Sequence, residues 1–302
     1  MDESQLRDVL KLLAIFKQKG LLPIPLYAVL KDAVLTTSGP GVDIRELCSR
    51  YDLDTLSHSH NLDTLLALHE ELETFARLRL NLLIKPLFDE QSLARAHQGA
   101  SRGSTELCGY FPACKEYDSQ CFVYGEIEFD SFTQILNISL NGLQRKLAKF
   151  VDLGSGIAKA VIWASLVTNF KHLVGIEINP QLHSSSISVL KTFQEIMLSN
   201  LYLSALAQTN QPKIELFLSS FLNLDVHDWT DADVVFANSA LFTEELMECL
   251  CVFSIKMKPG SRFITLTHRL SDSLRWKVIY KENRVNFSWG TATVWIHERV
   301  QT

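Results

Sequence analysis

The chain has 302 residues, 47% of them hydrophobic, and a formal net charge of −5. This length and composition are those of an ordinary soluble globular protein with one large domain or two smaller ones. No run of Lys and Arg stands out, so strong intrinsic binding of nucleic acid is not expected.

No segment has the features of a secretory signal or of a membrane span. We therefore expect a cytoplasmic or nuclear protein without a membrane partner. The cysteines are scattered, which favours free thiols in an intracellular chain. Three of them, Cys108, Cys114 and Cys121, lie near His97 but lack the close Cys-x-x-Cys spacing of a zinc site. No metal is expected.

Residues 1–105 are expected to form a helical N-terminal domain. Apolar residues recur at helical spacing in residues 6–15 and 62–84, and Pro86 ends the longer of these two segments. Core packing is the preferred interpretation of these apolar stripes, rather than a surface for a partner. A polar, glycine-bearing connector at residues 97–105 indicates the domain boundary.

Residues 106–302 alternate between strand and helix patterns. The seven expected strands are residues 150–153, 173–176, 214–218, 234–237, 262–267, 277–280 and 291–297. This order predicts an α/β fold with a doubly wound, Rossmann-like sheet. The last two strands have no long helix between them, so we expect them to form a hairpin that adds an antiparallel strand to an otherwise parallel sheet.

The most informative segment is Phe-Val-Asp-Leu-Gly-Ser-Gly-Ile-Ala-Lys, residues 150–159. It has the pattern of a strand, a glycine turn and a helix, and it is followed by a second apolar strand that ends in Glu177. Glycines let the backbone approach a ligand and turn sharply, and a carboxylate in this place can accept hydrogen bonds from two ribose hydroxyls. The segment predicts a site for a nucleoside cofactor.

The spacing favours S-adenosylmethionine over a dinucleotide. A dinucleotide turn requires a third small residue at position 159, which is Lys159 here. The methyltransferase pattern, acidic-x-Gly-x-Gly-x-Gly, fits Asp152, Gly154 and Gly156, with Ala158 at the third small position. A pyrophosphate needs bare amides at a helix N-terminus, whereas the ammonium of the methionyl tail needs a nearby carboxylate such as Asp152.

Further segments around this turn resemble one family. They are Tyr-Gly-Glu-Ile-Glu-Phe-Asp (124–130), Ser-Ser-Phe-Leu (219–222), Val-Val-Phe-Ala-Asn (234–238), Phe-Ser-Trp-Gly (287–290) and Thr-Val-Trp-Ile-His (293–297). Together they resemble the disruptor-of-telomeric-silencing (Dot1) type of histone H3 lysine methyltransferase, which lacks a SET domain. The resemblance extends from about residue 121 to 300. It implies a class I methyltransferase fold, a nuclear location and histone H3 in nucleosomes as the protein substrate.

The resemblance also implies roles for individual residues. The Tyr-Gly-Glu loop would lie over the methionyl part of the cofactor, Phe221 would stack on adenine, and Asn238 would lie by the methyl group. We therefore expect Tyr124 and Asn238 to be catalytic. The predicted cofactor-binding residues are Tyr124, Glu126, Asp152, Gly154, Ser155, Gly156, Glu177, Ser220, Phe221 and Asn238.

Three positions depart from the family pattern. Ser220 stands where an Asp often accepts from the adenine amino group, Ser239 stands where a second Asn is common, and Ala158 replaces the third glycine. No basic segment flanks the domain to contact nucleosomal DNA.

Methyl transfer requires a neutral lysine amine, and an apolar channel lowers the pKa of such an amine. We expect Tyr124, Asn238, Trp289 and Trp295 to line that channel. Two alternatives stay open: a methyltransferase of the same fold that acts on another protein or on a small molecule, and a non-catalytic scaffold. The scaffold is suggested by Ala158 and Ser220.

Overall fold

The computed structural model of the chain describes residues 84–88, 127–143, 148–199, 212–271, 274–287 and 290–301, and single residues before position 77. The chain divides into two compact units. One comprises residues 1–86, 166–169 and 193–211, and the other comprises residues 87–165, 170–192 and 212–302.

The second unit contains a seven-stranded sheet in the order β3-β2-β1-β4-β5-β7-β6. Its strands are β1 (Lys149–Leu153), β2 (His172–Glu177), β3 (Lys213–Leu218), β4 (Val234–Ala237), β5 (Arg262–Leu266), β6 (Trp276–Phe287) and β7 (Gly290–Arg299). The first five strands are parallel, and β7 runs antiparallel to both β5 and β6. The predicted α/β sheet with a C-terminal hairpin is confirmed.

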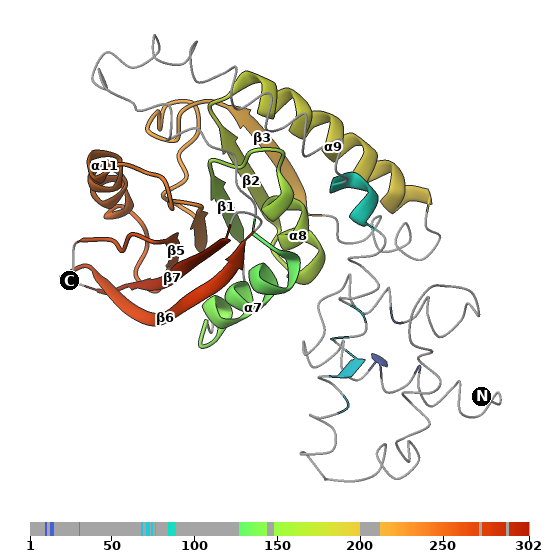
Figure 1. Cartoon of the computed structure of the whole chain (residues 1–302), viewed down its shortest axis with the longest axis horizontal. Coiled ribbons are helices and arrows are strands. Elements are labelled where there is room, and N and C mark those ends of the chain that lie inside the picture. The colour runs from blue at the N-terminus through green and yellow to red at the C-terminus, as the bar shows by residue number, and fades with distance from the viewer. Residues whose placement is uncertain are drawn as a thin grey trace. The chain divides into compact units, whose positions relative to one another are not determined.

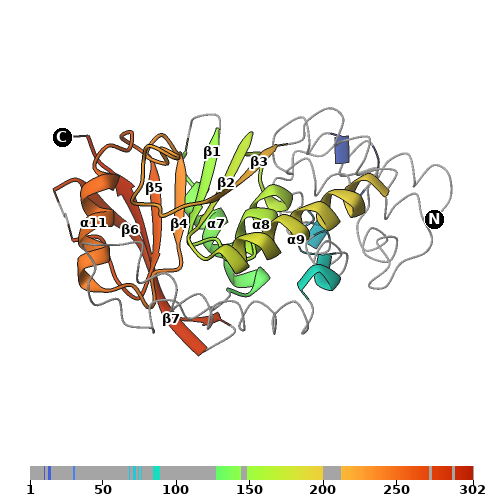
Figure 2. The same ribbon diagram turned by 90° about the horizontal axis from the view of Figure 1, so that it is seen from above.

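Helices cover both faces of this sheet (Figures 1 and 2). They are α7 (Phe129–Leu140), α8 (Lys159–Val167), α9 (Pro180–Ser199) and α11 (Glu244–Ser254). Helix α11 begins at an N-cap, Thr243, whose side chain accepts from the Leu246 amide, and two glutamates follow in its first turn. These features stabilise the unsatisfied amides of a helix N-terminus.

Alternate residues of the central strands face different layers. Val151 of β1 and Val235 of β4 belong to a buried cluster that includes Met247 and Leu250 of α11. Their neighbours point the other way: Phe150 and Phe236 both contact the ring of Phe132 in α7. This alternation is the period of a strand buried on both faces, and it assigns a face to every side chain on β1 and β2.

Strand β6 is longer than predicted. It spans 12 residues, Trp276–Phe287, whereas the sequence indicated residues 277–280. The pairing with β7 shifts register between Val278 and Tyr280 and again between Glu282 and Val285. Arg284 lies in the second irregularity with a φ of 62°. Such bulges break the alternation of apolar and polar residues that reveals a strand in a sequence.

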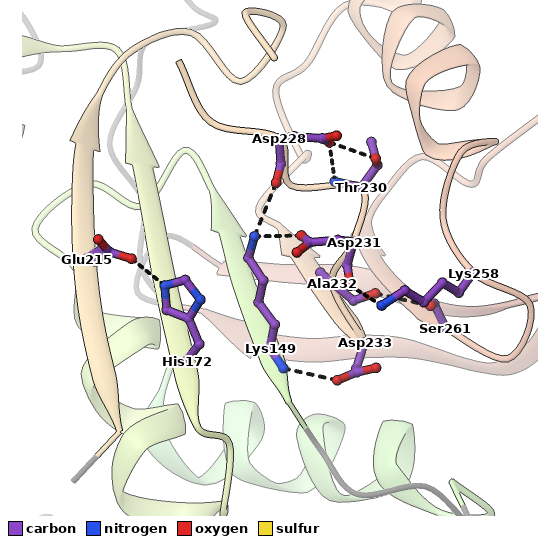
Figure 3. A network of polar contacts seen from close by, with 10 residues as sticks. All are labelled: Lys149, His172, Glu215, Asp228, Thr230, Asp231, Ala232, Asp233, Lys258 and Ser261. Atoms are coloured by element: carbon purple, nitrogen blue, oxygen red, sulfur yellow. Dashed lines mark hydrogen bonds and ion pairs between the residues drawn. The ribbon is translucent and has the colours of Figure 1, made fainter. Parts of the chain in front are cut away.

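Polar contacts join the strands at the edge where the parallel strands begin. Figure 3 shows Lys149, the first residue of β1, with its ammonium donating to Asp231 (2.6 Å) and to the Asp228 carbonyl (3.1 Å). The Lys149 amide donates to Asp233, which precedes β4, and His172 of β2 contacts Glu215 of β3 at 2.5 Å. These contacts join β1 to the segment before β4, and β2 to β3, near the amino ends of the strands and opposite the edge where ligands bind in such sheets.

The helical N-terminal domain and its boundary near residue 105 stay predictions. The described residues before position 77 are helical, and Leu13, Leu30, Leu68 and Leu72 among them are fully buried, but the connector at residues 97–105 lies outside the described part of the chain. None of the described helices is long and apolar enough to cross a membrane.

Candidate cofactor and active site

The glycine turn between β1 and α8 is built from left-handed residues. Gly154, Gly156 and Ala158 have φ values of 82°, 53° and 66°. The amides of Gly154 and Ser155 both donate to the Ile176 carbonyl of β2, at 2.9 and 3.1 Å. Gly154 is exposed, whereas the next four residues are buried. The turn thus presents bare backbone to solvent at Gly154, as a ligand site requires.

Gly175, in the middle of β2, allows the turn to pack this closely. A Cβ atom at Gly175 would lie 2.7 Å from Ser155 Oγ, 2.9 Å from Ser155 Cβ and 2.8 Å from a methyl group of Leu216. Only a residue without a side chain fits between the turn and β3. Gly175 was not among the residues predicted for the site, although a glycine inside an apolar strand is a signal of close backbone approach.

The carboxylate of Glu177 lies beneath the turn. One oxygen accepts from the Gly156 amide at 2.7 Å, and the other accepts from the Asn179 amide at 2.8 Å. Asn179 in turn caps α9, because its side-chain oxygen accepts from the amides of Gln181 and Leu182. Each oxygen of Glu177 keeps acceptor capacity beyond these bonds. The predicted position of this acid at the end of β2 is confirmed, while its contact with a ribose stays a prediction.

Asp152 and Glu177 form a buried acidic pair. They are 3% and 6% exposed. Burial, with the nearby Glu177 as a second cause, raises the pKa of Asp152 to about 8. Burial also raises the pKa of Glu177, against the lowering effect of the amides that it accepts. Two adjacent carboxyl groups away from water are unfavourable as anions, and a cation or several hydroxyl donors would stabilise them.

Ala158 occupies a position that favours glycine. Its left-handed backbone brings Cβ close to the following carbonyl in any L-residue with a side chain. Its amide donates to the Ser155 carbonyl at 2.8 Å, and its own carbonyl accepts from Ile162 in the first turn of α8. The departure from the glycine pattern noted in the sequence is therefore a site of backbone strain, and such strain is concentrated at functional sites.

A stacked pair of aromatic rings approaches Gly154 through one of its members, Phe242. Phe221, which follows β3, stacks on Phe242 with ring centroids 5.7 Å apart and an angle of 26°. If Gly154 carried a Cβ atom, its nearest neighbour would be the ring of Phe242, at 4.0 Å. The indole of Trp229 donates to the Phe221 carbonyl at 2.7 Å and holds this segment. Phe242 was not identified from the sequence, because only the fold brings the segment after β4 over the turn after β1.

The side chain of Ser220 makes a local hydrogen bond. An acidic side chain is common at this position in the family that the sequence resembles. The Ser220 hydroxyl oxygen accepts from the Leu222 amide at 3.1 Å, and the Ser220 carbonyl accepts from the Asn223 amide. This is a serine turn, which orders the loop that carries Phe221. The hydroxyl keeps one further acceptor position, which can accept a weaker hydrogen bond from a purine amino group than a carboxylate would.

Asn238 and Ser239 follow β4 at the same edge of the sheet. Asn238 is half-buried. Ser239 is fully buried, and its hydroxyl donates to the Leu266 carbonyl (2.8 Å) while accepting from the Leu266 amide (2.9 Å). The serine therefore joins the ends of β4 and β5. This structural role explains why a serine at position 239 is compatible with the fold.

The C-terminal hairpin meets the segment that precedes α7. Ile127 and Phe287 form an isolated antiparallel bridge. In the sequence, Tyr124 and Glu126 come shortly before Ile127, and Trp289 comes shortly after Phe287. These three residues are outside the described part of the chain, and their contacts stay predictions.

Trp295 of β7 is half-buried and makes contacts within the protein. Its indole donates to the Thr267 carbonyl at 3.1 Å, and the ammonium of Lys281 lies 4.6 Å from its ring centroid. Thr267 directly follows β5 and has a φ of 62°, an outlier for a β-branched residue. The predicted place of Trp295 in a lysine channel remains a prediction.

The loop after β5 is held by a buried histidine. His297 of β7 is fully buried; its Nδ1 lies 3.0 Å from the Phe263 carbonyl, and its Nε2 accepts from the Leu270 amide at 3.2 Å. These partners require the tautomer with a proton on Nδ1. Burial lowers the pKa of His297 to about 4. The histidine is thus neutral at physiological pH and positions the loop at the carboxyl edge of β5.

Among the described residues, no group of three or more His, Cys, Asp or Glu side chains could hold a metal ion. Of the cysteines in that part of the chain, Cys249 is an exposed thiol and Cys251 a buried one. The cluster of Cys108, Cys114, Cys121 and His97 lies outside the described residues.

The groups around the turn fit the predicted S-adenosylmethionine. A buried acidic pair can stabilise an ammonium and ribose hydroxyls, Gly154 offers uncovered backbone, and Phe221 with Phe242 offers apolar surface to a purine. A pyrophosphate at this turn would lie close to the same two carboxyl groups, which disfavours a dinucleotide.

Comparison with known proteins identifies a family. The model of the family described as "Histone methylation protein DOT1" matches residues 113–288, which is more than half of the chain. No curated protein matches the sequence.

Solved structures with similar folds share little sequence with the chain. A putative RNA methyltransferase from Pyrococcus horikoshii is 11% identical with a TM-score of 0.44, over 67% of this chain and 98% of that one. An rRNA methylase from Streptococcus thermophilus is 13% identical with a TM-score of 0.36, over 57% and 94%. TrmK of M. capricolum, in complex with S-adenosylhomocysteine, is 12% identical with a TM-score of 0.39, over 58% and 68%.

Proposed function

The chain belongs to the family of the histone methylation protein DOT1 and is an S-adenosylmethionine-dependent methyltransferase, and we propose that it methylates a lysine side chain of histone H3. The family supports a protein substrate and a chromatin-associated, nuclear protein. Within this class of substrate we propose H3 in nucleosomes.

The buried pair of Asp152 and Glu177 is the observation that most directly supports the binding of S-adenosylmethionine at this turn. Both carboxyl groups lie on the α8 side of the sheet, under the turn that carries Gly154 and Gly156. In the proposal, Asp152 accepts from the ammonium of the methionyl tail, together with Glu126. Glu177 accepts from the ribose hydroxyls through the acceptor positions that the Gly156 and Asn179 amides leave open.

Adenine would lie against Phe221, with Phe242 as a second aromatic ring. The ring centroids of Phe221 and Phe242 are 5.7 Å apart, which leaves no room for a purine between the rings. One ring therefore has to move when a purine binds between them. Ser220 would contribute its hydroxyl to the purine edge. These assignments follow the family pattern for Phe221 and add Phe242 from its place beside Gly154.

The protein's task in the reaction is positioning and exclusion of water. The cofactor supplies an activated methyl group. Asn238, at the carboxyl end of β4, and Tyr124 would orient the substrate amine, and an apolar lining from Trp289 and Trp295 would favour its neutral form. No strong base is required, because desolvation alone lowers the pKa of a lysine amine.

The acidic net charge of −5 is unfavourable for contact with nucleosomal DNA and is the observation that favours an alternative substrate. The other reading is that the same chemistry is directed to a different protein or to a small molecule. The test is methyl transfer from tritiated S-adenosylmethionine by the full chain to four substrates: nucleosomes, free histone H3, an H3 variant with its lysines replaced by arginine, and cell extract depleted of histones.

We expect label in H3 and none in the arginine variant. Label confined to the extract would overturn the histone assignment while leaving methyl transfer intact. Failure of S-adenosylhomocysteine to bind the folded chain in calorimetry would overturn the catalytic proposal and support a scaffold.

A further inference from the structure

A short 3-10 helix, η1 (Lys85–Phe88), contacts the glycine turn through its last residue. The ring of Phe88 packs with Ile157 and with Leu182 of α9, which are 1% and 5% exposed. Ile157 lies between Gly156 and Ala158, so Phe88 touches the turn itself. In Figures 1 and 2 the cyan helix η1 lies beside α9.

Phe88 also contacts the residue on the other side of Ala158. The ammonium of Lys159 lies 5.3 Å from the Phe88 ring centroid and 4.9 Å from that of Trp163. The two rings meet edge to face at 6.0 Å. A positive charge in the first turn of α8 is unfavourable with the helix dipole, and the two aromatic faces offset this.

The residue between these two contacts is the strained one. Ala158 has a φ of 66°, and an alanine keeps this conformation only where its surroundings determine it. The residues before and after it, Ile157 and Lys159, are both in contact with Phe88. Phe88 is not among the cofactor-site residues predicted from the sequence, which placed it in the helical N-terminal domain.

We propose that Phe88 is a positioning residue of the cofactor site, whose ring holds Ile157 and Lys159 and so keeps Ala158 in its left-handed conformation. The inference rests on the proposed function, because it assigns the turn to cofactor binding. Without the ring, part of the population would relax at Ala158 and move the Gly156 amide away from Glu177. The apparent affinity for the cofactor then falls in proportion to the fraction of molecules that keep the turn in its binding conformation.

A double-mutant cycle in the full chain tests this proposal. The four proteins are wild type, Phe88→Ala, Ala158→Gly and the double variant, and the readout is the Kd of S-adenosylhomocysteine in calorimetry. We expect Phe88→Ala to weaken binding about tenfold in the wild-type background and about twofold or less in the Ala158→Gly background. Glycine adopts the left-handed conformation without the steric cost that a Cβ atom adds. Phe253→Ala, which truncates a half-buried ring of α11, is the matched control and should leave the Kd unchanged.

Equal losses of affinity in both backgrounds would overturn the proposal. Unfolding of the same four proteins in urea gives a second readout that does not depend on the cofactor. In urea the order of the two backgrounds reverses. Phe88→Ala should lower the free energy of unfolding less in the wild-type background than in the Ala158→Gly background, because only a chain with Ala158 gains relief of strain when the turn relaxes.

The two readouts separate this inference from the proposed function. If wild type binds no S-adenosylhomocysteine, the proposed function fails, and the urea cycle alone decides whether Phe88 holds the turn. Additivity in urea would then overturn the inference. If Phe88→Ala does not fold, Phe88→Leu replaces it in the cycle, because leucine keeps apolar contact with Ile157 but removes the ring above Lys159.

Discussion

Asp152 and Glu177 lie on the same face of neighbouring parallel strands, Asp152 opposite Gly175 and Glu177 two residues further along β2. Both are almost fully buried, and burial raises the pKa of each. The pair therefore destabilises the ligand-free fold while providing the negative charge that the cofactor requires. This conflict between stability and binding makes the role of Asp152 measurable.

The first prediction concerns Asp152→Asn. With a folded pKa of about 8 and an unfolded value of 3.8, Asp152 binds more protons in the folded state between these pH values, so stability falls as pH rises through this window. Asparagine removes this loss and should stabilise the ligand-free protein by about 2–4 kcal/mol at neutral pH in urea unfolding. The same variant should bind S-adenosylhomocysteine at least tenfold more weakly. Asp225→Asn, at an exposed loop position, should change neither quantity.

The second prediction is a pH dependence of cofactor affinity. Below pH 8 the carboxyl group of Asp152 is protonated in the ligand-free protein, and an ammonium favours its ionised form, so binding releases a proton. Affinity for S-adenosylhomocysteine should rise from about pH 6 to pH 8, by up to about tenfold per unit. Methylthioadenosine, which lacks the amino-acid tail, is the control ligand. A parallel rise for both ligands would contradict the role of Asp152.

The third prediction concerns Gly175. A methyl group there would meet Ser155 Cβ at 2.9 Å as well as Leu216, and the Ser155 backbone cannot withdraw without disturbing the turn. Gly175→Ala should cost about 2–3 kcal/mol of stability and should abolish measurable cofactor binding. Gly260→Ala is the comparison, because its Cβ would meet nothing within 4 Å and only its φ of 81° is unfavourable. It should cost about 1 kcal/mol and leave binding unchanged.

Local sequence patterns predicted the sheet and the main features of the turn. Apolar runs predicted all seven strands, and the glycine spacing predicted the turn between β1 and α8 and the place of Glu177 at the end of β2, because these depend on residues close together in the chain. The length of β6 was missed because the bulges around Val278 and Val285 break the strand period.

The parts of the site that sequence reasoning missed are contacts between distant segments. Phe242 meets Phe221 and Gly154 only because β4 lies beside β1 in the sheet. Phe88 touches Ile157 across about 70 residues of chain, and the Gly175 contact with Ser155 depends on the packing of the turn on β2. Such contacts follow from topology, which no local periodicity contains.

The fourth prediction is a loss of stability in mild acid caused by His297. Its folded pKa of about 4 lies below the ordinary 6.5, so the unfolded chain binds more protons between these values. The neutral histidine therefore contributes full stability above about pH 6.5, and about 3 kcal/mol is lost as pH falls to 4. His297→Gln should flatten this part of the profile of unfolding free energy against pH. His268→Gln, at a half-exposed position, should retain the wild-type slope.

The fifth prediction separates catalysis from cofactor binding at the end of β4. Asn238 is half-buried beside Ser239, whose two bonds to Leu266 fix the backbone independently of the asparagine side chain. Asn238→Ala should therefore fold normally and lower kcat for methyl transfer about 100-fold or more, because the amine loses an orienting group. Asn141→Ala, at the end of α7 near the first residue of β5, truncates an exposed asparagine by the same atoms and should retain wild-type kcat. Equal rates for the two variants would remove Asn238 from the active site, whereas a loss of kcat with an unchanged Kd for S-adenosylhomocysteine would place its action on the substrate amine.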